Sequence, residues 1–105
     1  MIFKGVYNLL TGKQRSYLKG LGNNIEPIFQ LGKNGLSENF TKQVEEALEA
    51  RELIKIKILQ NCSLEAKEVG IQLAEETGAE LVQSIGSKFI LYRESKDNKR
   101  IELPK

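Results

Sequence analysis

The segment Gly32-Lys33-Asn34-Gly35 contains the residues whose types and spacing best suit a chemical task. Because glycine has no Cβ atom, two glycines let the backbone approach a phosphate closely and adopt positive φ angles. Lys33 adds a mobile cation at the centre of the segment. Ser37 follows at the expected start of a helix, where unpaired amides and the helix dipole also favour an anion. The segment is therefore a candidate phosphate clamp.

A simpler interpretation of this segment stays open, in which the glycines only permit a tight turn between a strand and a helix. The segment lacks the longer spacing and the Lys-Ser/Thr ending of a Walker A loop, and it does not match a dinucleotide fingerprint. A nucleotide-hydrolysing enzyme is therefore not expected. RNA-binding domains, by contrast, use a GxxG loop to hold backbone phosphates while neighbouring cations extend the contact.

The composition argues against the common catalytic classes. The chain has 105 residues, no histidine and a single cysteine, Cys62. Without histidine the usual general base of serine and cysteine hydrolases is missing, and a zinc site would depend on one thiol and carboxylates. We therefore predict a non-enzyme with no metal, no cofactor and no small-molecule substrate. A chain of this length forms one compact domain with a modest core.

The sequence also indicates where the protein acts. One cysteine cannot form an internal disulfide, and the N-terminal residues show no secretory signal. The longest apolar run, Phe89-Ile90-Leu91-Tyr92, is far shorter than the roughly 20 residues of a membrane span. We expect a cytoplasmic protein with no membrane partner.

The net charge of +2 conceals an uneven distribution. Residues 1–44 contain six basic and two acidic residues, a net charge of +4, whereas residues 61–82 carry a net charge of −4. The basic half suits an anionic partner such as RNA, and the acidic segment suits water or a basic protein.

The apolar spacing predicts an α/β fold, a single-domain α-β-α-β-α-β-β sandwich with a four-stranded mixed sheet and helices packed against it. Thr11 and Gln14 form a capping box that begins a helix over residues 11–22, with Arg15 and Lys19 on its polar face. The further elements expected are a strand at 28–31, a helix capped by Ser37, a strand at 53–59, a helix capped by Ser63 and ended by Gly78, and strands at 80–85 and 88–93 joined by a turn at Gly86-Ser87.

Within the strand at 53–59, isoleucines alternate strictly with Lys55 and Lys57, so the isoleucines form a core face and the lysines point the other way. Two interpretations of the lysines stay open: contact with a ligand, or protection of an exposed strand from aggregation. Elsewhere we expect Tyr17 and Tyr92 in the core, close packing at Gly70 and a largely irregular tail at 94–105.

Four segments, taken together, are more specific than the loop alone. In chain order they are Leu10-Thr11-Gly12-Lys13-Gln14-Arg15, Ile28-Phe29-Gln30-Leu31-Gly32-Lys33-Asn34-Gly35, Arg51-Glu52-Leu53-Ile54-Lys55, and Ile85-Gly86 through Tyr92-Arg93. They resemble the YhbY-like proteins, the bacterial stand-alone form of the CRM domain, which is named for chloroplast RNA splicing and ribosome maturation. The resemblance covers residues 9–103. It implies a fold similar to the C-terminal domain of translation initiation factor three.

The resemblance also implies a function, because bacterial members associate with precursors of the large ribosomal subunit. We therefore expect a non-catalytic RNA-binding protein that acts on ribosomal RNA during ribosome assembly, with ribosomal proteins as further partners. The RNA-binding residues carried over by position are Gly32, Lys33, Asn34 and Gly35 at the clamp and Lys13, Arg15 and Lys19 as adjoining cations. Lys55 joins them by our own inference from the polar strand face.

The expected organisation is an N-terminal extension at 1–8 with no family counterpart, a CRM RNA-binding domain at 9–94 and a charged C-terminal tail at 95–105. An alternative function stays open, in which the protein is an interaction module that docks a basic partner such as a ribosomal protein. The acidic residues of the third expected helix would form its surface: Glu65, Glu68, Glu75 and Glu76.

Overall fold

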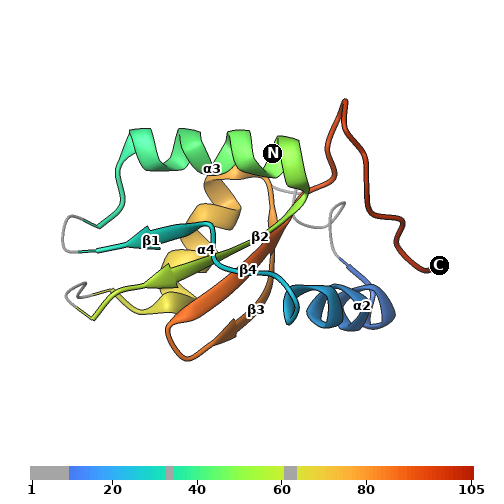
Figure 1. The fold of residues 1–105 in the computed structure, drawn as a ribbon, viewed down its shortest axis with the longest axis horizontal. Coiled ribbons are helices and arrows are strands. Elements are labelled where there is room, and N and C mark those ends of the chain that lie inside the picture. Colours follow the sequence, from blue (N-terminus) through green and yellow to red (C-terminus); the bar gives the residue numbers. More distant parts are fainter. Residues whose placement is uncertain (1–9, 33–34, 61–63) are drawn as a thin grey trace.

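A four-stranded mixed sheet organises the computed structural model, which describes residues 10–32, 35–60 and 64–105 (Figure 1). The strand order is β1-β2-β4-β3. Strand β1 (Phe29–Leu31) runs parallel to β2 (Leu53–Ile58), whereas β4 (Lys88–Tyr92) runs antiparallel to β2 and to β3 (Glu80–Ile85). The predicted α/β fold is confirmed, and each strand boundary agrees with the sequence prediction within one residue.

Among the described residues, three helices cover the two faces of this sheet. Helices α3 (Glu38–Arg51) and α4 (Ala66–Thr77) pack on one face, and α2 (Gly12–Gly22) packs on the other. In Figure 1, α2 lies beneath the right-hand end of the sheet, away from the end where β1 and β2 stop and β3 turns into β4. Part of the α2 side of the sheet is therefore not covered by any of the described helices.

Local capping explains where α2 and α3 begin. Thr11 Oγ1 accepts a 3.0 Å hydrogen bond from the backbone N–H of Gln14, whose side-chain oxygen accepts from the N–H of Thr11 at 3.1 Å. Ser37 Oγ accepts the N–H of Phe40 at 3.1 Å. Both predicted caps are thus confirmed.

The predicted cap at Ser63 is wrong. Helix α4 begins at Ala66, its N-cap is Glu65, and no side chain caps it, while Ser63 lies outside the described residues. Ala66 and Val69 are both buried against the sheet, so tertiary packing rather than a hydroxyl determines the first turn. The other end of α4 follows the prediction, because Gly78 takes a left-handed φ of +74° that suits glycine.

Two hydrophobic clusters lie on opposite faces of the sheet. The larger one, between the sheet and helices α3 and α4, includes Ile54, Ile56 and Ile58, which confirms the predicted core face of β2. The smaller one, under α2, consists of Leu18, Leu53, Val82, Ile90 and Tyr92.

The two tyrosine predictions have different outcomes. Tyr92 is buried, and burial, with the nearby carboxylates of Glu52 and Glu94, raises its pKa to about 12. Tyr17 is not in the core, because its side chain is 44% exposed. Successive helical residues differ by about 100° around the axis, and Leu18 takes the position that faces the sheet.

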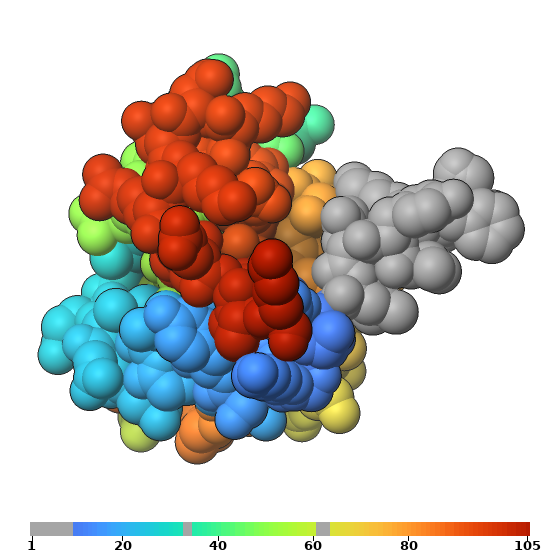
Figure 2. Space-filling model, turned by 90° about the vertical axis from the view of Figure 1, so that its right-hand side faces the viewer, coloured from blue at the N-terminus to red at the C-terminus, as the bar shows by residue number. Residues whose placement is uncertain are grey.

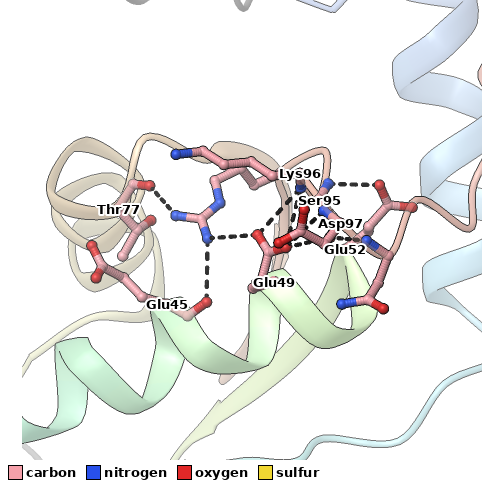
Figure 3. Close-up of polar contacts among 9 residues, drawn as sticks. Glu45, Glu49, Glu52, Thr77, Ser95, Lys96 and Asp97 are labelled. Carbon is pink, nitrogen blue, oxygen red and sulfur yellow. Dashed lines mark hydrogen bonds and ion pairs between the residues drawn. The ribbon is translucent and has the colours of Figure 1, made fainter.

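The C-terminal tail has no regular secondary structure, as predicted, but it is firmly attached to the end of α3 (Figure 3). The buried carboxylate of Glu52 accepts the backbone N–H groups of Ser95, Arg100 and Ile101, each at 2.7 Å. Glu49 accepts the Ser95 hydroxyl, also at 2.7 Å. These carboxylates give the irregular segment a defined course.

The same tail packs against α2. Figure 2 shows the last residues beside α2, where the side-chain amide of Gln14 donates to the carbonyl oxygen of Pro104 at 3.1 Å. Ile101 and Leu103 pack against the cluster under α2. The tail is therefore part of the packed structure.

Candidate nucleic-acid interface

The ends of the predicted phosphate clamp are joined by a backbone hydrogen bond. The N–H of Gly35 donates to the carbonyl oxygen of Gly32 at 3.0 Å, and Gly35 has a φ of +65°. These features agree with the interpretation of the glycines as turn residues. Lys33 and Asn34 lie outside the described residues, so the predicted phosphate contact stays a prediction.

A row of four residues crosses the α2 side of the sheet at the end where β1 stops. Gln30 pairs with Lys57, Lys57 with Lys88, and Lys88 with Ile85. Directly paired residues project to the same face, and strands lie about 4.8 Å apart, so the row spans about 14 Å. We call these four residues the end row. It lies at the end of the sheet that α2 does not cover (Figure 1).

The end row contains two like charges directly opposite each other. Lys57 of β2 faces Lys88 of β4, an arrangement that weakens a sheet. Lys55 lies two residues before Lys57 on the same face and pairs with Ile90. The Lys88 residue is exposed, and Lys55 and Lys57 are half-buried. The uncovered end of the sheet is therefore positively charged and suited to an anionic ligand.

A β-bulge in β3 shapes the surface beside these lysines. The register passes from Leu81 opposite Leu91 to Gln83 opposite Ile90, so Val82 is an additional residue in the ladder. Such a bulge changes the direction of the side chains that follow it. Gln83 and Ile85 consequently share the α2 side of the sheet with the lysines.

Arg15, predicted as an RNA contact, donates its hydrogen bonds within the protein. Its Nη1 bonds to the carbonyl oxygens of Leu81 and Val82 at 2.6 Å and 3.2 Å, and its Nη2 lies 3.5 Å from Glu80 Oε1. Burial raises the pKa of Glu80, and the Arg15 charge opposes that rise. Arg15 therefore attaches α2 to the bulge instead of lying on a solvated face with Lys19.

The other two predicted cations of α2 are exposed but far apart along the helix. Lys13 is in the first turn, and Lys19 is in the last turn, next to the C-cap residue Asn23. At about 1.5 Å per residue, Lys13 lies about 15 Å along the helix from Asn23. The structure thus brings Lys19 toward the uncovered end of the sheet but does not bring Lys13 there.

A cleft of about 270 Å³ lies between the C-terminus of α2 and the end row. Its lining residues are Asn23, Lys55, Gln83, Ile85, Ser87, Lys88 and Ile90. The sequence analysis identified only Lys55 among them. The strands and the turn at Gly86-Ser87 were predicted, but the bulge that decides which side chains face the cleft is not encoded by any local motif.

Comparison with known proteins identifies the fold family. The model of the CRS1 / YhbY (CRM) domain matches residues 10–93. The chain belongs to this family. The resemblance found in the sequence is thus confirmed, and the CRM domain accounts for every helix and strand described above.

Two relatives of this CRM protein match it over nearly their whole length. The probable RNA-binding protein YqeI of Bacillus subtilis (strain 168) is 50% identical over 96 residues, which cover 91% of this chain and 100% of YqeI. An RNA-binding protein of Haemophilus influenzae is 41% identical over 97 residues, which cover 91% of this chain and 96% of that protein. The solution structure of the protein SAV1595 from Staphylococcus aureus has a TM-score of 0.76 and 56% identity, and the match covers 91% of this chain and 100% of that one.

The part of the chain that the structure describes has neither a metal-binding cluster nor a membrane-spanning helix. Within it, no group of three His, Cys, Asp or Glu side chains is arranged to hold a metal ion. None of its helices has both the length and the apolar character needed to cross a membrane.

Proposed function

We propose that this CRM protein binds RNA in the cytoplasm without catalysing a reaction, and that its target is ribosomal RNA of large-subunit precursors during ribosome assembly. The relatives named as RNA-binding proteins support the first part. The resemblance to a family named partly for ribosome maturation supports the second part. Ribosomal proteins in the same particles are the further partners.

The pairing of Lys57 with Lys88 is the observation that carries the proposal. Like charges on adjacent strands destabilise the free protein, and a bound phosphate removes that repulsion. The pair lies at the end of the sheet where β1 leads into the Gly32–Gly35 segment. Backbone phosphates therefore bind across the end row and the clamp.

The remaining predicted residues take distinct roles in this proposal. Lys33 and Asn34 complete the clamp, and Lys55 and Lys19 extend the basic surface along the sheet and α2. Arg15 is a positioning residue that holds the bulge. Lys13 contacts RNA only if the bound strand continues along α2.

Replacing Lys88 by glutamate tests the proposal in a way that separates binding from folding. Lys88→Glu places opposite charges at the Lys57 pair, so the fold gains about 0.2–1 kcal/mol. The same change opposes phosphate, so affinity for RNA falls several-fold at low salt. Filter binding and thermal denaturation measure the two effects.

A matched control is Lys67→Glu, which makes the same change of net charge on the exposed side of α4. We expect this variant to bind RNA nearly as well as the wild type. Equal losses of affinity in the two variants would mean that only overall charge matters, and the end row would lose its assigned role.

The alternative function, docking of a basic protein on the acidic side of α4, is tested by a different experiment. Glu76 is exposed but accepts hydrogen bonds from Thr41 and Gln72, so the test uses Glu65, Glu68 and Glu75, which are also exposed. Lysine replacements at these three exposed positions should leave co-purified proteins unchanged in nuclease-treated lysate. If the lysine variant loses partner proteins that the wild type still captures after RNA has been removed, the interaction module is favoured.

A further inference from the structure

We infer that the cleft between α2 and the end row is a subsite for one unstacked RNA base, with Gln83 accepting a hydrogen bond from the base and Ile85 packing against its face. This inference rests on the proposed function, because it deepens the RNA site. The proposed function concerns phosphates, which carry no sequence information, whereas a base subsite would supply contacts to the bases themselves.

The β-bulge is the first observation that supports a built site. With an uninterrupted register after Leu81, Gln83 would lie opposite Phe89, which is fully buried in the larger core cluster. The extra residue Val82 instead keeps the Gln83 amide on the α2 side. It also places Ile85 opposite Lys88, where the isoleucine is 59% exposed. Bulges commonly redirect side chains in this way beside functional sites.

The hydrogen-bonding state of Gln83 is the second observation. Its Oε1 atom is buried and has no hydrogen-bond partner among the described residues. Gln83 lines the cleft, and folded proteins satisfy most buried polar atoms, so a small rotation of this side chain would let its unpaired acceptor bond to a ligand that donates. Every RNA base carries an N–H group on its Watson–Crick edge.

The size and charge of the cleft fit one base with its phosphates. Its volume of about 270 Å³ is at the lower limit of pockets that hold drug-sized ligands, roughly 300–1,000 Å³, so it suits a smaller group. The apolar side chains of Ile85 and Ile90 line it and can pack on the face of a base. Lys55 and Lys88 also line it and can hold the adjoining phosphates.

The test compares a single-stranded oligoribonucleotide of mixed sequence with an abasic oligonucleotide of the same length. The wild type should bind the base-containing strand more tightly. Gln83→Met and Ile85→Ala should each lower affinity for that strand by about fivefold or more, and leave affinity for the abasic strand unchanged. Because Gln83→Met removes an unpaired buried acceptor, its thermal midpoint should not fall, and misfolding is excluded as the cause.

Ile71→Ala is the matched control, since Ile71 is a 43% exposed isoleucine on α4, away from the cleft. It should bind both strands like the wild type. If the wild type binds both strands equally and Lys88→Glu weakens both, the protein contacts phosphates only and the base subsite is overturned while the proposed function stands. If the wild type binds neither strand, the proposed function fails and the subsite fails with it.

Discussion

The guanidinium of Arg15 in α2 donates a 2.6 Å hydrogen bond to the carbonyl oxygen of Leu81 in β3. A second hydrogen bond, at 3.2 Å, reaches the carbonyl oxygen of the next residue, Val82. One side chain therefore holds two successive carbonyl groups at the bulge, where the sheet ladder is locally interrupted. Because the bulge directs Gln83 and Ile85 into the cleft, Arg15 positions the candidate site without lining the cleft itself.

Replacing Arg15 by methionine should cost stability. The variant keeps most of the aliphatic chain but removes charge-assisted hydrogen bonds to the bulge, so the free energy of unfolding should fall by about 1–3 kcal/mol. Urea denaturation measures the change. Lys19→Met, at an exposed position of the same helix, should stay within about 0.5 kcal/mol of the wild type. Equal stability of the two variants would contradict the scaffold role of Arg15.

Replacing Glu52 by glutamine should release the C-terminal tail. Glu52 has a φ of +68°, unusual for a residue other than glycine, and its carboxylate accepts three backbone N–H groups. Glutamine cannot accept all three with the same strength, so we expect a loss of about 2 kcal/mol or more. Hydrogen exchange at Ser95 and Ile101 should accelerate. Glu102→Gln, exposed in the same tail, should leave that exchange slow.

Glu49 and Glu52, the two carboxylates that anchor the tail, make the stability of the fold depend on pH in the acid range. The Ser95 hydroxyl and nearby amide donors lower the pKa of Glu49 below its ordinary 4.5. Burial raises the pKa of Glu52, but its three amide donors outweigh burial, and the pKa is lowered overall. Because both folded-state values lie below the unfolded ones, the stabilisation is complete above pH 4.5 and is lost as pH falls through the lowered values.

Glu80 acts in the opposite sense, because burial raises its pKa. Its contribution to folding stability is fully present below pH 4.5 and is lost as pH rises through the raised pKa. We expect Glu49 and Glu52, whose pKa values are lowered, to dominate the pH dependence of stability. The thermal midpoint should therefore fall between about pH 5 and pH 3. A Glu49→Gln, Glu52→Gln double variant should show a shallower slope, and an unchanged slope would contradict this account.

Two glycine-to-alanine changes should have opposite effects. A Cβ at Gly70 would lie 2.8 Å from Leu81 Cδ1 and 3.1 Å from Phe89 Cδ2, whereas a Cβ at Gly20 meets nothing within 4 Å. Gly70→Ala overpacks the core, so the net loss should be about 1 kcal/mol even after the gain in helix propensity. Gly20→Ala should stabilise α2 by up to about 1 kcal/mol. Thermal denaturation of both variants tests the prediction, and stabilisation of both would show that α4 has room to move.

Lys33→Glu tests the clamp directly. We expect weaker RNA binding, an almost unchanged thermal midpoint, and a smaller slope of log affinity against log salt, by about 0.7 for each lost contact to single-stranded RNA. Titrations at several salt concentrations give the slope. Wild-type affinity at low salt would remove the clamp from the proposed site.

Local patterns predicted those parts of the fold that depend on neighbours in the chain. The capping box at Thr11, the alternation in β2 and the hairpin turn at Gly86 all follow from residues within a few positions of each other. The β3 bulge does not, because it depends on how two strands and a helix fit together. Arg15 and Leu81 are 66 positions apart, and no local signal joins them.

The candidate site was therefore predicted only in part. Lys55 was found because β2 alternates, but its neighbours Lys88 and Gln83 depend on strand register and on the bulge. The anchoring role of Glu52 was also missed. In the sequence it resembles any charged residue between a helix and a strand, and its partners are main-chain amides, which no residue pattern reveals.

The tail held by Glu52 places the end of the folded unit beyond the end of the matched family domain. The family pattern ends at residue 93, yet Ile101 and Leu103 belong to the packing under α2. A fragment or fusion cut at the edge of the pattern would keep every helix and strand but uncover apolar surface on α2, and it would tend to self-associate. The unit that must fold together is thus longer than the matched domain, in agreement with the 96 residues that this chain shares with its Bacillus subtilis relative.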